Sequence, residues 1–159
     1  MAHRISMSFV ASALLALPTL PGARADTGAK IVEEVDFATS CSPTVQHSFK
    51  HAVWTLHSFW YPEALKDFTA VTEADPNCAI GYWGIAMSHW YPLWYPPQPA
   101  ALKAGSDAVA KAMAAPTQTE REKDYIAAIA AFYRDNDKLD HQTRAVAYEK
   151  AMEHQASVP

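Results

Sequence analysis

The sequence has little charge, no long apolar run after its first 25 residues, and no alternation of apolar and polar residues with period two. Only 19% of the 159 residues are charged and half are apolar. That composition is typical of one folded domain and excludes an intrinsically disordered chain. No apolar run after residue 25 is long enough to cross a bilayer. Because half-buried strands alternate with period two, the missing alternation indicates an all-α fold.

The motifs of common enzyme classes are also missing. The chain contains no G-x-S-x-G, no P-loop, no G-x-G-x-x-G and no H-E-x-x-H. Glu33 and Glu34 lie before the first predicted helix, and Glu120 and Glu122 stand at a helix start, so neither pair makes an acid/base site by itself. The sequence therefore identifies no catalytic residue and no cofactor. It leaves enzymatic activity undecided and favours a non-enzymatic role.

Residues 1–25 have the pattern of a secretory signal peptide. Arg4 precedes an apolar run over Met7–Leu20, and Ala23-Arg24-Ala25 is an A-x-A cleavage pattern. The alternative is an N-terminal anchor helix. Cleavage would leave 11 basic and 17 acidic residues, a net charge of −6. We therefore expect an exported protein, periplasmic or extracellular, that binds neither nucleic acid nor, after cleavage, a membrane.

Helix signals recur from Ser42 onward. We expect helices that begin near Pro43 and Pro62, a third over Cys78–Trp90, a fourth over Pro99–Ala115, and two more that begin near Thr119 and Asp140. Ser42 is a suitable N-cap, and Thr119 stands three residues before Glu122, which is a capping-box spacing. The prolines of residues 92–97 break the chain before the fourth helix. Helical spacing places Met113 on the buried face of that helix.

Six helices in pairs suggest an internal repeat. Residues 48–54 align with residues 82–88 at an offset of 34, so that Ala52 matches Ala86. The second predicted helix then carries the tetratricopeptide pattern, which here consists of Tyr61, Ala64, Phe68 and Pro76. Pairs of short amphipathic helices bury their faces by stacking on neighbouring pairs. We therefore expect about three antiparallel helix pairs in a right-handed superhelix.

Two cysteines, Cys41 and Cys78, are present, and neither belongs to a C-x-x-C or C-x-x-C-H motif. The missing motifs argue against thioredoxin-like redox chemistry, a zinc knuckle and covalent haem. An even number of cysteines in an exported protein suggests a disulfide, and the alternative is two buried free thiols. Cys41 precedes the first helix of the first pair and Cys78 opens the first helix of the second pair. Because these helices should lie side by side and parallel, their N-termini would be neighbours.

Three motifs resemble sequences shared by exported bacterial tetratricopeptide-repeat proteins. They are HSF-x-Y-x-EA at His57–Ala64, DP-x-CA-x-x-YWG-x-AM at Asp75–Met87 and PLW at Pro92–Trp94. The resemblance covers roughly residues 37–154 and implies the N-terminal part of a longer repeat protein, in a family without a settled biochemical activity. We accordingly divide the chain into a signal peptide (1–25), a leader (26–40) and a tetratricopeptide-like domain (41–159).

The prolines that should mark repeat ends are spaced irregularly. Pro76, Pro116 and Pro159 are separated by 40 and 43 residues rather than 34. The resemblance therefore implies insertions in the second and third pairs. The sequence stops at Pro159, where a further pair should open, so the domain is compatible with truncation at its C-terminus.

The resemblance implies a concave surface lined by the first helix of each pair. The ligand-binding residues expected there are Phe49, Val53, His57, Trp83, Met87, Trp90 and Tyr91, with Trp94 at the rim in the inserted loop. Rigid aromatic rings with polar edges suit such a surface. We expect the domain to hold a protein or peptide partner in this aromatic groove. The alternative is that these aromatic residues only fill the core.

Two further functions stay open. One is a metal- or small-ligand-binding protein or enzyme that uses His57, His89 and the Trp-rich loop. His47 and His51 are four residues apart on one predicted helix and could share an ion. No third ligand is evident, so no metal site is predicted. The other is a purely structural end-stack that docks onto further repeats.

Overall fold

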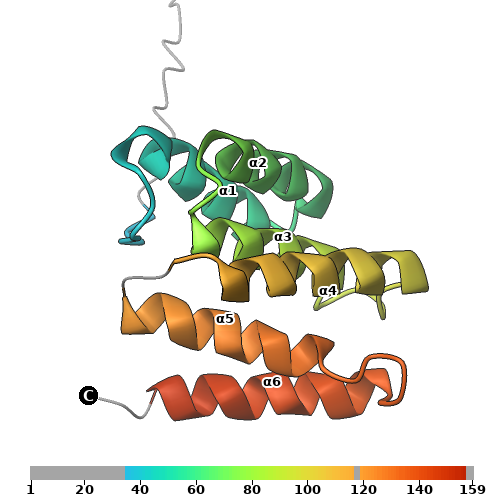
Figure 1. Cartoon of the computed structure of the whole chain (residues 1–159). Helices are drawn as coiled ribbons and strands as arrows, with labels where there is room; N and C mark the ends of the chain where they lie inside the picture. Colours follow the sequence, from blue (N-terminus) through green and yellow to red (C-terminus); the bar gives the residue numbers. More distant parts are fainter. Residues whose placement is uncertain (1–34, 117–118, 157–159) are drawn as a thin grey trace, which may run out of the picture. The chain divides into compact units, whose positions relative to one another are not determined.

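The computed structural model describes residues 35–116 and 119–156, with side chains up to residue 153. They form η1 (Pro43–Val45), α1 (Gln46–His57), α2 (Tyr61–Ala74), α3 (Ala79–Trp90), α4 (Pro99–Ala114), α5 (Glu120–Tyr133) and α6 (His141–Ala156) (Figure 1). The described ranges contain no strand, so the all-α prediction is confirmed. The predicted signal peptide (1–25), most of the leader (26–34) and Pro159 lie outside the described residues.

The helices begin close to the predicted positions, and their first turns explain why. At α5, Thr119 Oγ1 accepts the backbone N–H of Glu122 at 3.2 Å and donates to its carboxylate at 2.7 Å. The first helix differs from the prediction. Ser42 caps a 3₁₀ turn in which the Val45 N–H bonds back to the Ser42 carbonyl at 3.0 Å. Since this bond spans three residues, the tighter 3₁₀ form precedes α1.

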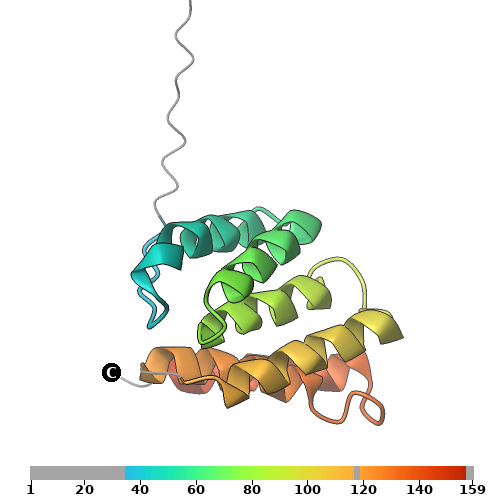
Figure 2. The same cartoon turned by 45° about the horizontal axis from the view of Figure 1, so that its top comes forward.

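The helices form a stack of pairs. Each helix packs against the next along the chain, and α3 also contacts both α1 and α5. Figures 1 and 2 show the succession from α1 and α2 at one end to α5 and α6 at the other. The result is a helical repeat-like fold. Within the described ranges, no helix combines the length and the apolar character that a membrane span requires.

Small residues let the stacked helices approach one another. Ala52, Ala64 and Ala86, which the repeat pattern placed at helix contacts, are fully buried. Gly84 of α3 lies so close to α2 that a Cβ there would overlap the Phe68 ring. The fully buried aromatic and aliphatic side chains around these contacts include Phe49, Phe68, Ile80, Ile129 and Phe132. A continuous core therefore runs through all three pairs.

The buried face of α4 is made of small side chains. Gly105 faces α5, and a Cβ there would overlap the phenol of Tyr133. The Tyr133 hydroxyl donates to the Ala86 carbonyl of α3 at 2.8 Å, so Gly105 leaves room for a hydrogen bond between two other helices. The prediction that Met113 is buried is wrong, because its side chain is 68% exposed. The buried positions of α4 are Gly105, Ala108, Val109 and Ala112.

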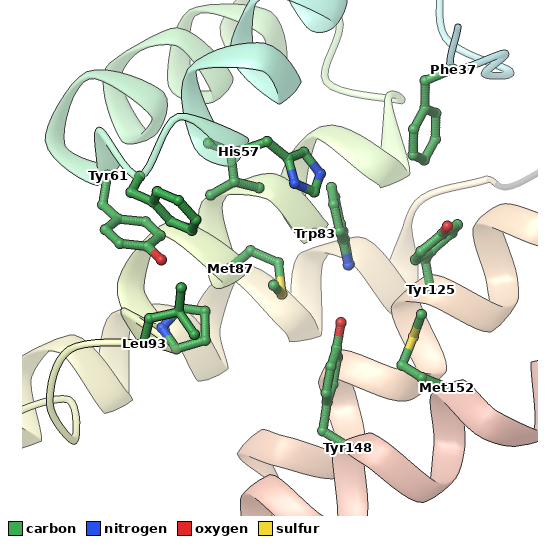
Figure 3. Close-up of a pocket in the computed structure, with 12 residues that line it drawn as sticks. Phe37, His57, Tyr61, Trp83, Met87, Leu93, Tyr125, Tyr148 and Met152 are labelled. Carbon is green, nitrogen blue, oxygen red and sulfur yellow. The ribbon is translucent and has the colours of Figure 1, made fainter. Parts of the chain in front are cut away.

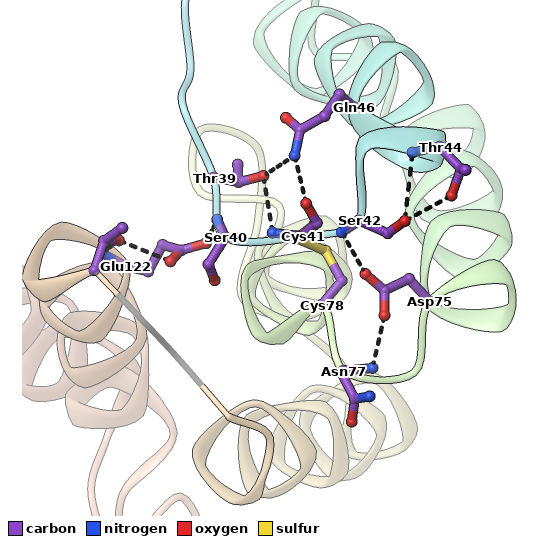
Figure 4. Close-up of a disulfide and its surroundings, with 11 residues drawn as sticks. Thr39, Ser40, Cys41, Ser42, Thr44, Gln46, Asp75, Asn77, Cys78 and Glu122 are labelled. Carbon is purple, nitrogen blue, oxygen red and sulfur yellow. Dashed lines mark hydrogen bonds between the residues drawn. A yellow bond between two sulfur atoms is a disulfide. The ribbon is translucent and has the colours of Figure 1, made fainter.

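The predicted disulfide between Cys41 and Cys78 is present (Figure 4). It joins the segment before η1 to the start of α3, with the two Cα atoms 4.6 Å apart. Asp75 supports this junction, because its carboxylate accepts the N–H groups of Ser42 at 2.8 Å and Asn77 at 3.1 Å. The disulfide and Asp75 together fix the start of the first helix pair against the start of the second.

Candidate functional site

A cavity of about 320 Å³ lies between helices α1, α3, α5 and α6, and we call it the aromatic cavity. It is lined by Phe37, Leu56, His57, Phe59, Tyr61, Trp83, Met87, Pro92, Leu93, Tyr125, Tyr148 and Met152 (Figure 3). Within the described part of the chain, the lining contains no aspartate, glutamate, lysine or arginine. An apolar, aromatic cavity of this size with few polar groups is typical of a site for a small ligand or an inserted side chain.

Three of the predicted site residues meet at the aromatic cavity, namely His57, Trp83 and Met87. Trp83 is only 4% exposed. Its ring lies 6.2 Å from that of Phe37 and 5.5 Å from that of Tyr125. Trp83 is therefore both a core residue and part of the cavity wall. The sequence left these two roles, packing in the core and lining a binding surface, as alternatives.

Three other predicted site residues lie in the core instead. Phe49 and Val53 are 0% and 2% exposed, and neither lines the aromatic cavity. Phe49 was expected to point into the concave surface, but Phe37 packs against it with the two ring centroids 5.4 Å apart. Trp90 stacks on Phe132 of α5 with ring centroids 4.0 Å apart. The predicted groove assumed an open helix face, but Phe37 of the N-terminal segment packs on Phe49 and Phe132 of α5 packs on Trp90.

The last two predicted site residues lie near the rim. Trp94 is 63% exposed and packs edge-on against Phe59, which lines the cavity, at 6.5 Å. Tyr91 does not line it and packs against Tyr61 at 5.0 Å. Both Phe59 and Tyr91 have positive φ, 62° and 55°. Such backbone is strained for large side chains and is concentrated at functional sites, so the ends of α1 and α3 present aromatic rings at a conformational cost.

The N-terminal segment over residues 35–40 is not helical, and it enters the site through Phe37. The Phe37 ring is 7% exposed and lies among aromatic side chains of α1, α3 and α5. Polar groups hold the end of this segment (Figure 4). The Ser40 N–H donates to the buried Glu122 carboxylate at 2.9 Å, and the Gln46 side chain donates to Thr39 at 2.8 Å.

Sequence reasoning missed several lining residues for different reasons. Tyr125 of α5 and Tyr148 and Met152 of α6 join Trp83 at the cavity only because of the way α5 and α6 stack on the rest of the domain. Phe37 belongs to no periodic element, so no signal in the sequence placed it in the site.

The polar groups of the described lining are the phenols of Tyr61, Tyr125 and Tyr148, the indole of Trp83 and the imidazole of His57. Burial, with a smaller contribution from Tyr125, raises the pKa of Tyr148 to about 12. Burial also raises the pKa of Tyr61. Both phenols therefore keep their protons at neutral pH. The indole nitrogen of Trp83 is buried and has no hydrogen-bond partner.

The histidines whose side chains the structure describes do not gather at one site. His57 lines the aromatic cavity, whereas the half-buried His89 does not. His51 Nδ1 lies 3.0 Å from the Asp67 carboxylate, and His47 is exposed. Among the residues that the structure describes, the group of three side chains placed to share a metal ion is Cys41, Asp75 and Cys78, and the disulfide occupies both of its sulfur atoms.

Comparison of the chain with protein-family models, curated proteins and solved structures gives no match.

Proposed function

We propose that this protein is an exported, tetratricopeptide-like scaffold that binds an extended segment of a protein or peptide partner in the aromatic cavity. The helix contacts support a superhelix of this type, because α3 packs against α1 and α5 as well as against its chain neighbours. The buried alanines at 34-residue spacing, Ala52 and Ala86, agree with it. The disulfide supports export, since disulfides persist in oxidising compartments.

The observation that carries this proposal is the position of the chain's own segment over residues 35–40. A non-helical segment inserts one aromatic ring, Phe37, between α1, α3 and α5, and side chains of the helical domain hold its backbone through Ser40. These are the interactions by which a groove recognises an extended peptide, namely an aromatic anchor and bonds to the main chain. Phe37 lines the cavity without filling it. The free volume is therefore placed to take a second apolar side chain.

Selection of peptides tests this proposal. A library of random twelve-residue peptides displayed on phage is panned against the protein, and the affinity of the enriched peptides is measured by fluorescence anisotropy. We expect enriched peptides to share an aromatic or large aliphatic residue. Met87→Gln should weaken the binding of these peptides about 5- to 150-fold, because burying an amide against an apolar ligand costs about 1–3 kcal/mol.

Met113→Gln is the matched control, since Met113 is exposed on α4 and does not line the aromatic cavity. It should leave the affinity unchanged, and both variants should retain the helicity of the parent chain by circular dichroism. If no peptide is enriched, or if the enriched peptides bind Met87→Gln as tightly as the parent, the proposal is wrong.

A further inference from the structure

The buried indole N–H of Trp83 is an unused donor at the wall of the aromatic cavity. Trp83 is 4% exposed, and its Nε1 has no hydrogen-bond partner. Figure 3 shows this nitrogen pointing toward the side of the cavity where the hydroxyl of Tyr148 points back at it. Buried donors are nearly always paired, because leaving one unpaired costs free energy. An unpaired donor at a cavity wall therefore marks a position for an acceptor.

The direction of this donor is fixed. The Trp83 ring packs edge-on against Phe68 at 6.4 Å and Tyr125 at 5.5 Å, and it lies 6.2 Å from Phe37. Rings on three sides prevent the indole from turning to another partner. A donor that is already oriented binds an acceptor without a further cost in side-chain entropy.

We propose that the aromatic cavity binds an uncharged aromatic group bearing one hydrogen-bond acceptor, such as a carbonyl oxygen, which accepts from Trp83 Nε1. The aromatic preference follows from the rings of Tyr61, Trp83, Tyr125 and Tyr148 around the cavity, since aromatic pairs gain energy beyond the area they bury.

The preference for an uncharged group follows from the lining. Among the residues that the structure describes, no carboxylate, ammonium or guanidinium lines the cavity, and an unpaired charge is costly to bury. Arg121 contacts the outside of the wall, where its exposed guanidinium lies over the Phe37 ring at 4.6 Å and the Tyr125 ring at 5.7 Å. Its side chain is not part of the described lining.

This inference rests on the proposed function, because it names the chemistry that the same cavity would select in a peptide. An aromatic side chain would supply the ring, and the neighbouring backbone carbonyl would supply the acceptor. It also applies to a small molecule with the same two groups, so it can be tested without knowing the partner.

The test uses two probes of nearly equal shape, 2-acetylnaphthalene and 2-ethylnaphthalene, which differ in whether they carry a carbonyl oxygen. Their dissociation constants are measured by fluorescence for the parent chain, Trp83→Phe and Trp90→Phe. The ratio of the two constants removes the general effect of hydrophobicity. We expect Trp83→Phe to reduce the preference for the ketone about fivefold, because a typical hydrogen bond contributes about 1 kcal/mol.

Trp90→Phe is the matched control. Trp90 also has a buried, unpaired indole nitrogen, and it does not line the aromatic cavity. Its ring packs edge-on against Tyr148 of the lining at 4.7 Å, so any effect of Trp90→Phe on the shape of the cavity should act on both probes alike. It should leave the ratio unchanged. A second measurement uses the unaltered protein and does not depend on the stability of either variant. Among the indole N–H resonances of the five tryptophans, one should move downfield with the ketone and not with the hydrocarbon.

Three results would overturn the inference: an unchanged ratio in a folded Trp83→Phe variant, no indole resonance that distinguishes the two probes, or no binding of either probe. If selected peptides still bind in a manner that depends on Met87, the proposed function survives these failures. If the ketone binds through Trp83 but no peptide is enriched, the cavity takes a small molecule and the peptide proposal fails.

Discussion

Gly105 shows how one missing side chain lets three helices share a hydrogen bond. A Cβ at this position of α4 would overlap the phenol of Tyr133 and push its hydroxyl away from the Ala86 carbonyl. We expect Gly105→Ala to lower the free energy of unfolding by about 1–3 kcal/mol, since overpacking a filled contact costs that much. Urea denaturation followed by circular dichroism measures the change.

Tyr133→Phe distinguishes two causes of the expected loss in Gly105→Ala, namely the steric overlap with the phenol and the loss of its hydrogen bond. It removes the hydroxyl and should cost about 1 kcal/mol by itself. Because the hydroxyl oxygen is the atom nearest to the added Cβ, Gly105→Ala should cost less in the Tyr133→Phe background than in the parent chain. Equal costs in both backgrounds would show that Gly105 and Tyr133 are not coupled.

His89 makes stability depend on pH. Burial lowers the pKa of its imidazole, so the folded chain favours the neutral form. The unfolded chain binds the proton more readily than the folded chain. The free energy of unfolding is therefore highest above the ordinary histidine pKa of about 6.5, and it declines as the pH falls below that value. Burial lowers the pKa of His141 in the same direction. We expect the melting temperature to decrease as the pH is lowered from 7.5 to 5.

Substitution identifies the histidines responsible. His89→Gln together with His141→Gln should flatten the dependence of the melting temperature on pH, because glutamine does not titrate in this range. His47→Gln, at an exposed position of α1, should leave the slope as it is. A slope that survives the double substitution would assign the effect to other groups.

The same scale shows what helical spacing can and cannot predict. It placed Trp83 and Met87 on one face of the third helix, and both residues line the aromatic cavity. It placed Trp90 on that face too, but α5 supplies Phe132 to stack on it. A period of 3.6 identifies the face of a helix and does not say which neighbour covers each turn of that face.

At the scale of elements, most of the fold could be predicted from local signals. The capping box at Thr119 and the cap at Asp140, which accepts the Thr143 N–H at 2.8 Å, fix the starts of α5 and α6. Prolines before α4 set its start at Pro99. These signals depend only on neighbours in sequence. The short 3₁₀ turn before α1 and the exposure of Met113 were not predicted, because they depend on packing.

The disulfide is the covalent link between the first two helix pairs. It joins residues 37 apart in sequence, and closing a loop of this length contributes about 3–4 kcal/mol through the entropy of the unfolded chain. Reduction with dithiothreitol should lower the free energy of unfolding by that amount, as measured by urea denaturation. A Cys41→Ser, Cys78→Ser double variant should match the reduced protein and should not respond to reductant.

Alkylation of natively purified protein without prior reduction provides the companion observation. Mass spectrometry should find no modified cysteine. Labelling of both cysteines, or equal stability of the oxidised and reduced chains, would contradict the structural role assigned to this bond.

At the scale of the whole molecule, the site depends on contacts between segments far apart in sequence. Phe37, Trp83 and Tyr125 come from the N-terminal segment, α3 and α5, and their rings meet within about 6 Å. The repeat pattern predicted that first helices of pairs would share one surface, which explains why α1 and α3 contribute. It could not predict that residues 35–40 would cover one end of that surface.

The central claim is that the aromatic cavity, and no other surface of the helical stack, receives the partner. Methionine methyl groups report on this directly, because Met87 of α3 and Met152 of α6 line the cavity while Met113 lies outside it on α4. The measurement is a titration of ¹³C-methyl-methionine-labelled protein with a selected peptide, followed by NMR. The account predicts that the Met87 and Met152 methyl resonances shift together, at one affinity, while the Met113 resonance stays in place. Shifts confined to Met113, or a bound peptide that moves neither Met87 nor Met152, would contradict it.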